Sequence, residues 1–173
     1  TTELYGTEDG LNSNSIEAFN QISDSVFIIG TSRGLNIFNK NNKHVKTILK
    51  EDGLSSNHIY SISKGLELGT FWIGTIYGLT YFDSNKNLFK NFFVRDGLSH
   101  NEFNRFSNFK DKNGRFYFGG VNGMNIFNSD DLLKIEPAPK VMLTNVQYFD
   151  GKLNETIAQQ TDLNSLKNIA LKP

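Results

Sequence analysis

The chain has 173 residues, of which 13% are aromatic and only three are proline, and short runs of Ile, Val and Thr lie between Gly, Asn and Asp residues. This composition favours β-strands over helices. The 18 Lys and Arg residues equal the 18 Asp and Glu residues in number, so no net field attracts nucleic acid, and the absence of Cys excludes disulfides, thiolate nucleophiles and cysteine zinc sites.

Residues 1–8 precede the first copy of an internal repeat. Each copy opens with Asp-Gly-Leu, followed three positions later by Asn and two positions after that by an apolar residue. The copies of this block are DGLNSNSI (9–16), DGLSSNHI (52–59) and DGLSHNEF (96–103). A second block follows in each copy, as FIIGTSRGLNIF (27–38), FWIGTIYGLTYF (71–82) and FYFGGVNGMNIF (116–127). Self-similarity with a period of about 44 residues is typical of repeat proteins.

Four short strands are predicted in each copy. The first begins at Ile16, Ile59 and Phe103; the second is 26–31, 70–75 and 115–120; the third is 34–39, 78–83 and 123–128; the fourth is 44–50 and 88–94. The connections between the second and third strands end in Gly and suit tight hairpins. Four antiparallel strands per repeat is the pattern of a β-propeller blade, and the missing 3.6-residue periodicity excludes helical repeats.

The predicted fold class is therefore all-β, a fragment of a β-propeller with about three four-stranded blades. The predicted blades are 9–51, 52–95 and 96–136, of which the last is partial, and residues 1–8 are expected to be the outer strand of a preceding blade.

The residues that recur in every copy have a structural explanation. The Asp of Asp-Gly-Leu is expected to bond backbone amides two residues further on, and its Gly accepts a positive φ. The Asn at 14, 57 and 101 is expected to cap the entry into the first strand, and the Leu at 11, 54 and 98 to pack between neighbouring blades.

The mid-strand glycines at 30, 74 and 119 are expected to have a close neighbour that needs the space. Trp72 shares its column with Ile28 and Tyr117, which favours packing between blades over a sugar-stacking surface.

The sequence offers no catalytic constellation. The histidines at 44, 58 and 100 fall in non-equivalent columns without a second ligand at metal-binding spacing. No nucleophile elbow, phosphate loop or zinc-protease helix occurs. A propeller enzyme would need His, Arg, Tyr or acidic residues clustered on its axis, and no such cluster is visible in the sequence. We therefore predict no catalytic residue, no metal ligand and no cofactor, and no enzymatic activity for this chain.

Topology indicates where a ligand would bind. In a four-stranded meander, the Asp-Gly-Leu loop and the turn between strands two and three lie on the same face. That turn varies among the copies, and residues that vary on a rigid scaffold are suited to specificity. The predicted contacts with a ligand or partner are Arg33, Tyr77 and Asn122 from these turns, with His58 and His100 from the neighbouring loops. The alternative is that they are ordinary solvated turn residues.

The repeat pattern ends after Phe127. The stretch NSDDLLKIEPAP, with Pro137 and Pro139, is typical of a linker between domains. KVMLTNVQYFDGK then predicts a strand that enters a turn at Asp150–Gly151, and a weak second strand is predicted near 169–171. Residues 137–173 thus form a linker and the beginning of a second β-domain, because so short a segment cannot close a sandwich.

The segments DGLSSNHIYSI, FWIGTIYGLTYF and PAPKVMLTNVQYFDGK together resemble the two-component regulator propeller repeats and the start of the Ig-like Y_Y_Y domain of Bacteroidetes hybrid two-component sensor histidine kinases. The resemblance covers nearly the whole chain. It departs from the family pattern in copy one, which has Phe-Ile-Ile-Gly in place of the Trp block, and in copy three, which has Phe-Tyr-Phe-Gly-Gly.

The resemblance implies a periplasmic sensor region that signals to a cytoplasmic histidine kinase and responds to an oligosaccharide. It supplies no binding motif, so the site residues above rest on topology. The alternative is a scaffold or protein-interaction propeller without a ligand of its own. No apolar run approaches the ~20 residues of a membrane span, so we expect no direct membrane contact in this segment. Three blades leave open sheet faces and edges, which predicts a homodimer or other self-association, or a place in a larger ring.

Overall fold

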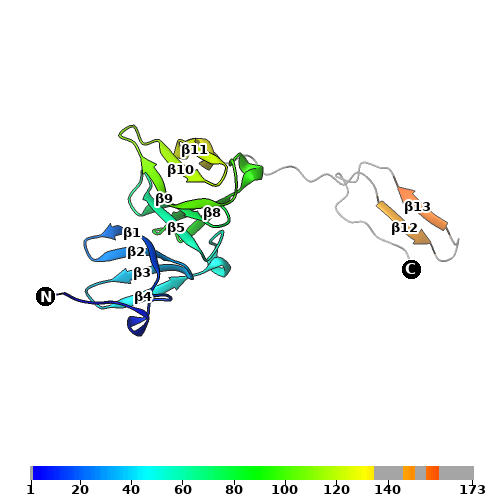
Figure 1. Cartoon of the computed structure of the whole chain (residues 1–173). Coiled ribbons are helices and arrows are strands. Elements are labelled where there is room, and N and C mark those ends of the chain that lie inside the picture. Colours follow the sequence, from blue (N-terminus) through cyan, green and yellow to red (C-terminus); the bar gives the residue numbers. More distant parts are fainter. Residues whose placement is uncertain (1, 135–145, 151–154, 160–173) are drawn as a thin grey trace. The chain divides into compact units, whose positions relative to one another are not determined.

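The computed structural model describes residues 2–134, 146–150 and 155–159 (Figure 1). The chain divides into two units, Thr1–Lys134 and Ile135–Pro173. The first contains three antiparallel sheets. Sheet 1 is β1 (Ile16–Ser23), β2 (Val26–Thr31), β3 (Gly34–Asn39) and β4 (His44–Ile48); sheet 2 is β5 (Ile59–Lys64), β6 (Thr70–Thr75), β7 (Leu79–Asp83) and β8 (Leu88–Phe92); sheet 3 is β9 (Phe103–Lys110), β10 (Phe116–Gly120) and β11 (Gly123–Phe127).

The strands pair in chain order within each sheet, which is the meander expected from the repeat. The first strands begin at Ile16, Ile59 and Phe103 as predicted. The two fourth strands end two residues earlier than predicted, because the chain turns there into the 3-10 helices Lys50–Asp52 and Val94–Asp96. A third 3-10 helix, Thr7–Asp9, precedes sheet 1. The all-β fold class is confirmed.

Sheet 3 has only three strands among the described residues. After β11 the chain enters the short helix α1 (Ser129–Leu133) instead of a fourth strand. The second unit contains the antiparallel pair β12 (Val146–Asp150) and β13 (Glu155–Gln159). β12 lies within the segment predicted to form a strand, whereas β13 was not predicted. The expected linker prolines and the strand near 169–171 lie outside the described residues.

Alternating side chains on each strand form the interfaces between sheets. Ile28 and Leu35 of sheet 1 pack with residues of sheet 2 that include Phe71 and Ile73. A second cluster joins Trp72 of sheet 2 to sheet 3. Trp72 is completely buried, and its indole N–H donates to the Ser129 hydroxyl at 3.0 Å. The prediction that Trp72 packs between sheets is confirmed, and its ring is not available to a sugar.

The repeated Leu also packs as predicted, with Leu54 in the first cluster and Leu98 in the second. The mid-strand glycines have the expected close neighbours. A Cβ atom on Gly30 would lie within 2.4 Å of an Ile59 methyl carbon, and one on Gly74 would lie 2.6 Å from the Ser61 hydroxyl oxygen. Both neighbours belong to β5, so glycine lets the inner strand of sheet 2 approach closely.

Two expectations about the Asp-Gly-Leu loop were wrong in detail. The Asp carboxylate accepts the backbone N–H of the residue three positions earlier, not that of a residue two positions later. The Asn amide oxygen accepts the backbone N–H of the residue seven positions earlier and does not cap the first strand. The bonds are Gly6 to Asp9 (2.9 Å), Leu49 to Asp52 (2.8 Å), Phe93 to Asp96 (2.8 Å), Thr7 to Asn14 (2.8 Å), Lys50 to Asn57 (2.6 Å) and Val94 to Asn101 (2.8 Å). The physical reason is the 3-10 helix, whose first N–H groups have no partner within the helix. The glycines at 10, 53 and 97 have the predicted positive φ.

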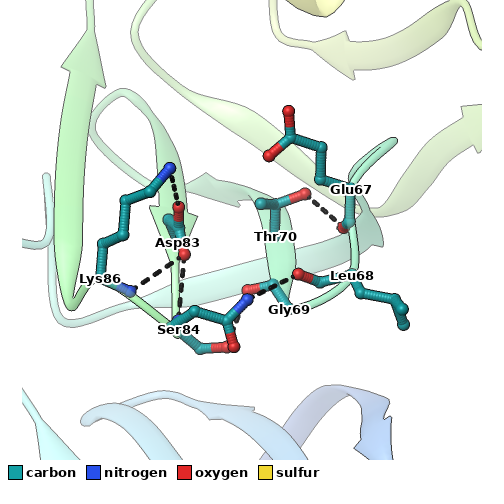
Figure 2. Close-up of polar contacts among 8 residues, drawn as sticks. Glu67, Leu68, Gly69, Thr70, Asp83, Ser84 and Lys86 are labelled. Atoms are coloured by element: carbon teal, nitrogen blue, oxygen red, sulfur yellow. Dashed lines mark hydrogen bonds and ion pairs between the residues drawn. The ribbon is translucent and has the colours of Figure 1, made fainter.

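The opposite end of sheet 2 is held by contacts between the β5–β6 and β7–β8 connections (Figure 2). The Ser84 hydroxyl donates across the two connections to the Gly69 carbonyl oxygen at 2.7 Å, and within the β5–β6 connection the Thr70 hydroxyl donates to the Glu67 carbonyl oxygen at 2.7 Å. Asp83, whose side chain is buried, accepts backbone N–H groups of residues 85 and 86 and pairs with the Lys86 ammonium at 3.1 Å.

Candidate ligand-binding face

We define the turn face as the end of sheets 1–3 that carries the Asp-Gly-Leu loops and the β2–β3, β6–β7 and β10–β11 turns. The two sets of connections lie side by side because the residue after the second strand donates its N–H to the carbonyl of the residue before the first strand. These bonds are Ser32 to Ser15 (3.4 Å), Ile76 to His58 (3.1 Å) and Val121 to Glu102 (3.3 Å). The loops and turns therefore share one face, as the meander topology requires.

The five predicted contact residues all lie on this face, but they do not form one cluster. Arg33 is exposed on the β2–β3 turn, where its carbonyl accepts from the Asn12 side chain at 3.0 Å. Asn122 is exposed on the β10–β11 turn and donates to the Ser99 carbonyl at 3.2 Å. The exposed His100 accepts the Glu102 N–H through Nδ1 at 3.0 Å. Tyr77 lines an open hollow on this face, and His58 lies within reach of Arg105 in a group of polar side chains on the inner strands.

Tyr77 lines an open hollow of about 360 Å³, together with Phe93, Val94, Arg95 and Asn101. Tyr77 is 55% exposed, and the centroid of its ring lies 5.6 Å from that of the Phe93 ring. The Arg95 guanidinium lies 5.2 Å from the Phe93 centroid, a cation–π contact. Two aromatic rings and a cation thus border a space that is open to solvent.

His58 belongs to a polar group on the inner strands, which we call the inner cluster: Glu17 of β1, His58 beside β5, Tyr60 of β5 and Arg105 of β9. β5 lies beside both β1 and β9 (Figure 1). The Arg105 guanidinium pairs with the Glu17 carboxylate at 3.2 Å and lies 5.3 Å from the Tyr60 centroid. Its terminal nitrogen lies 3.5 Å from His58 Nε2.

The inner cluster brings together His, Arg, Tyr and acidic side chains, a grouping that was not visible in the sequence. Glu17 and Tyr60 share one repeat column, whereas His58 and Arg105 lie in two others, so alignment of the copies indicated no cluster. The Glu17 side chain is 6% exposed and also accepts the Ser15 hydroxyl at 3.0 Å. The carboxylate is therefore engaged by the loop before β1 and by β9, and the Arg105 side chain, 51% exposed, presents its remaining donors to solvent.

Another hollow, of about 190 Å³, lies at the opposite end of sheet 2 and includes Leu66, Leu68, Lys64 and Lys110 in its lining. The Lys110 ammonium donates to the Gly65 carbonyl at 3.1 Å. None of the five predicted residues contacts this space. Within residues 2–134, no group of three His, Cys, Asp or Glu side chains is placed to hold a metal ion. No helix of the described chain is long and apolar enough to cross a membrane.

A scan against protein-family models finds no match, and no curated protein matches the chain. Solved structures do match. The extracellular domain assigned to the hybrid two-component system BT3049 of B. thetaiotaomicron is 25% identical, with a TM-score of 0.71 over 88% of this chain and 22% of that chain. Two structures of the BT4673 extracellular domain from the same organism, assigned to a one-component and to a hybrid two-component system, are each 17% identical. Their TM-scores are 0.58 and 0.56, over 87% and 90% of this chain and 23% and 22% of theirs.

This chain spans about a fifth of the length of these structures. The matches confirm the resemblance to the extracellular region of Bacteroides two-component systems and agree with an extracytoplasmic address. They are extracellular domains of signalling systems rather than catalytic domains, which agrees with the prediction that this chain is not an enzyme. The propeller-repeat and Y_Y_Y assignments stay predictions.

Proposed function

We propose that this chain is part of the periplasmic sensor region of a hybrid two-component receptor, and that its turn face contributes to the binding of an oligosaccharide. The observation that carries the sensor role is the match to an extracellular domain assigned to such a system, at 25% identity over 88% of this chain.

The composition of the turn face supports a carbohydrate ligand. A sugar ring has C–H faces that pack on aromatic rings and hydroxyl edges that need hydrogen-bond partners. Tyr77 and Phe93 offer the first, and Arg95 lies beside them. Arg33 and Asn122 extend the polar surface along the neighbouring turns. The free donors of Arg105 in the inner cluster face solvent at the same end of the sheets.

Signalling would follow from a difference in affinity between two arrangements of the receptor. A ligand that binds one arrangement more tightly shifts the population towards it. We propose that this shift passes through the second β-domain to a cytoplasmic histidine kinase. The turn residues need no catalytic role in such a mechanism.

The first test is thermal unfolding of the chain with a panel of oligosaccharides, repeated with the triple variant Arg33→Ala, Tyr77→Ala, Asn122→Ala. Ligand at about a hundred times its Kd stabilises the folded state by about 2.7 kcal/mol, which raises the Tm of a chain of this size by several degrees. We expect the triple variant to lose most of this increase.

The matched control is the triple variant Lys40→Ala, Leu68→Ala, Lys112→Ala, with one exposed residue at the opposite end of each sheet. It should keep the full increase in Tm. An oligosaccharide that stabilises the wild type and both variants equally would place its site elsewhere. That outcome would favour the alternative, in which these sheets are a scaffold for protein contacts.

A further inference from the structure

The inner strand of each sheet has a β-bulge, and the bulge of β9 is longer than the other two. In the second strand of each sheet, the repeated glycine has one neighbour on either side. The inner-strand partners of these two neighbours enclose the bulge, which is 17–18 in β1, 60–61 in β5 and 104–107 in β9. The bulge of β9 therefore has four residues instead of two.

The backbone of the longer bulge is unusual. Phe106 has a φ of 58°, in the left-handed region that bulky side chains rarely adopt. Among the described non-glycine residues, it alone combines a positive φ with a position inside a strand. Bulges redirect side chains and are frequent beside binding sites. Here the longer bulge carries Arg105, which contacts residues of sheets 1 and 2.

The three bulges supply the centre of the inner cluster. Glu17 belongs to the bulge of β1, Tyr60 to that of β5 and Arg105 to that of β9. The Arg105 guanidinium lies against the Tyr60 ring, at 5.3 Å from its centroid, while Nε pairs with the Glu17 carboxylate at 3.2 Å. Since the ring and the carboxylate both hold the guanidinium, its orientation is fixed before a ligand binds.

The groups that the inner cluster presents to solvent are donors. The Glu17 carboxylate is buried and already accepts from Arg105 and from the Ser15 hydroxyl. Arg105 keeps further N–H groups, and its Nη2 lies 3.5 Å from His58 Nε2, at the long end for a hydrogen bond. When Nε2 carries a proton, both nitrogens can donate to one group beside them. A carboxylate accepts and does not donate, so it fits this set better than a sugar hydroxyl does.

We propose that the inner cluster binds the carboxylate of an acidic sugar, so that the ligand of this region is an oligosaccharide that contains uronic acid residues. The inference rests on the proposed function and names its ligand class. Arg105 binds the carboxylate and determines the specificity, and His58 donates the second hydrogen bond. Glu17 and Tyr60 are positioning residues that hold the guanidinium.

The test is titration calorimetry of the chain with oligogalacturonate and oligoglucuronate, and with their methyl esters, which keep the sugar rings but lack the charge. We expect the acids to bind at least about tenfold more tightly than the esters. Arg105→Gln should weaken binding of the acids by a similar factor. Added salt should weaken binding to the wild type but have much less effect on this variant, because the charge it screens is gone.

The matched control is Arg115→Gln, which removes an exposed arginine at the opposite end of sheet 3 and should keep full affinity. Because Arg105→Gln leaves the buried Glu17 carboxylate without its cation, thermal unfolding without ligand checks that the variant folds. Glu17→Gln/Arg105→Gln removes both charges and should lose the same affinity for uronates.

Three outcomes would overturn the inference: uronate binding that survives in both Arg105 variants, equal affinity for acid and ester, or tighter binding of a sulfated oligosaccharide than of any uronate. The proposed function is judged separately. A neutral oligosaccharide that stabilises the wild type but not the triple variant at Arg33, Tyr77 and Asn122 would support it even if no uronate binds, a result that would itself refute the carboxylate site.

Discussion

The Asp and Asn of each repeat satisfy neighbouring N–H groups of the same 3-10 helix. In the second copy, Asp52 accepts the Leu49 N–H and Asn57 accepts the Lys50 N–H. Neither group has a partner within so short a helix. Since Asn57 lies two residues before β5, its bond also joins the start of the inner strand to the loop. The repeated Asn thus sets the path of the chain from one sheet to the next.

Replacement of this Asn should destabilise the fold. We expect Asn57→Ala to lower the free energy of unfolding by about 1 kcal/mol, as for other lost helix caps. Urea titration followed by circular dichroism measures the difference. Asn113→Ala, at an exposed loop position, is the control and should stay within about 0.5 kcal/mol of the wild type. Equal effects of the two substitutions would contradict the capping role of Asn57.

At the scale of the element, the β7–β8 turn is built around a buried carboxylate (Figure 2). Burial raises the pKa of Asp83, but hydrogen bonds from the Lys86 side chain and from the backbone N–H groups of Lys86 and Asn85 outweigh this effect. The pKa of Asp83 is therefore lowered from its usual value. Asn39 occupies the same column in sheet 1, where its amide oxygen accepts the Asn41 N–H at 2.9 Å. A neutral residue can thus form the same type of turn.

The lowered pKa predicts how stability depends on pH. Ionised Asp83 stabilises the folded state above the pH of an ordinary carboxyl group, near pH 4, and this contribution is lost as the pH falls through the lower pKa of the folded state. Asp83→Asn should therefore be less stable than the wild type at neutral pH, and the difference should shrink below about pH 4. Urea unfolding as a function of pH measures it.

Lys86→Met separates the two causes of this shift. It removes the ammonium but keeps the two backbone bonds to Asp83. Part of the pH dependence should therefore remain in this variant. A difference between the wild type and Asp83→Asn that stays constant with pH would contradict the assignment to Asp83.

At the scale of the whole molecule, neighbouring sheets are joined by side chains in equivalent columns. Ile28 fills this position between sheets 1 and 2, and Trp72 between sheets 2 and 3. Tyr117 is the third member; it is half-buried, and the residues opposite it, Phe109 and Ile126, are exposed. The same residue column is therefore core or surface according to whether a further sheet covers it.

Trp72→Phe tests this dependence on the neighbouring sheet. The substitution removes volume from the cluster and leaves the Ser129 hydroxyl without its indole donor, so we expect a loss of about 1–3 kcal/mol in the free energy of unfolding. Tyr117→Phe is the matched control in the same column and should cost less than about 1 kcal/mol, because its hydroxyl bonds an accessible Asp111. Equal costs would contradict the assignment of Trp72 to the inter-sheet core.

The sequence by itself determined the strands of sheets 1–3, their order and the residues that pack between sheets. These features depend on the alternation of apolar and polar residues along a strand and on the residue types in turns. Both are local patterns and occur in all three copies of the repeat, so a strand predicted in one copy is supported by the same pattern in the other two. It also placed Arg33, Tyr77, Asn122, His58 and His100 on one face, because a meander brings alternate connections to the same end.

Only the tertiary structure decided which side chains meet. Arg105 reaches Glu17 and His58 across three inner strands, and no alignment of repeats predicts contacts between different columns of different copies. The direction of the Asp and Asn bonds also needed the 3-10 helix, a feature too short to leave a period in the sequence. The burial of each sheet face depends on which sheet lies beside it, because a period of two predicts an apolar face but not what covers it.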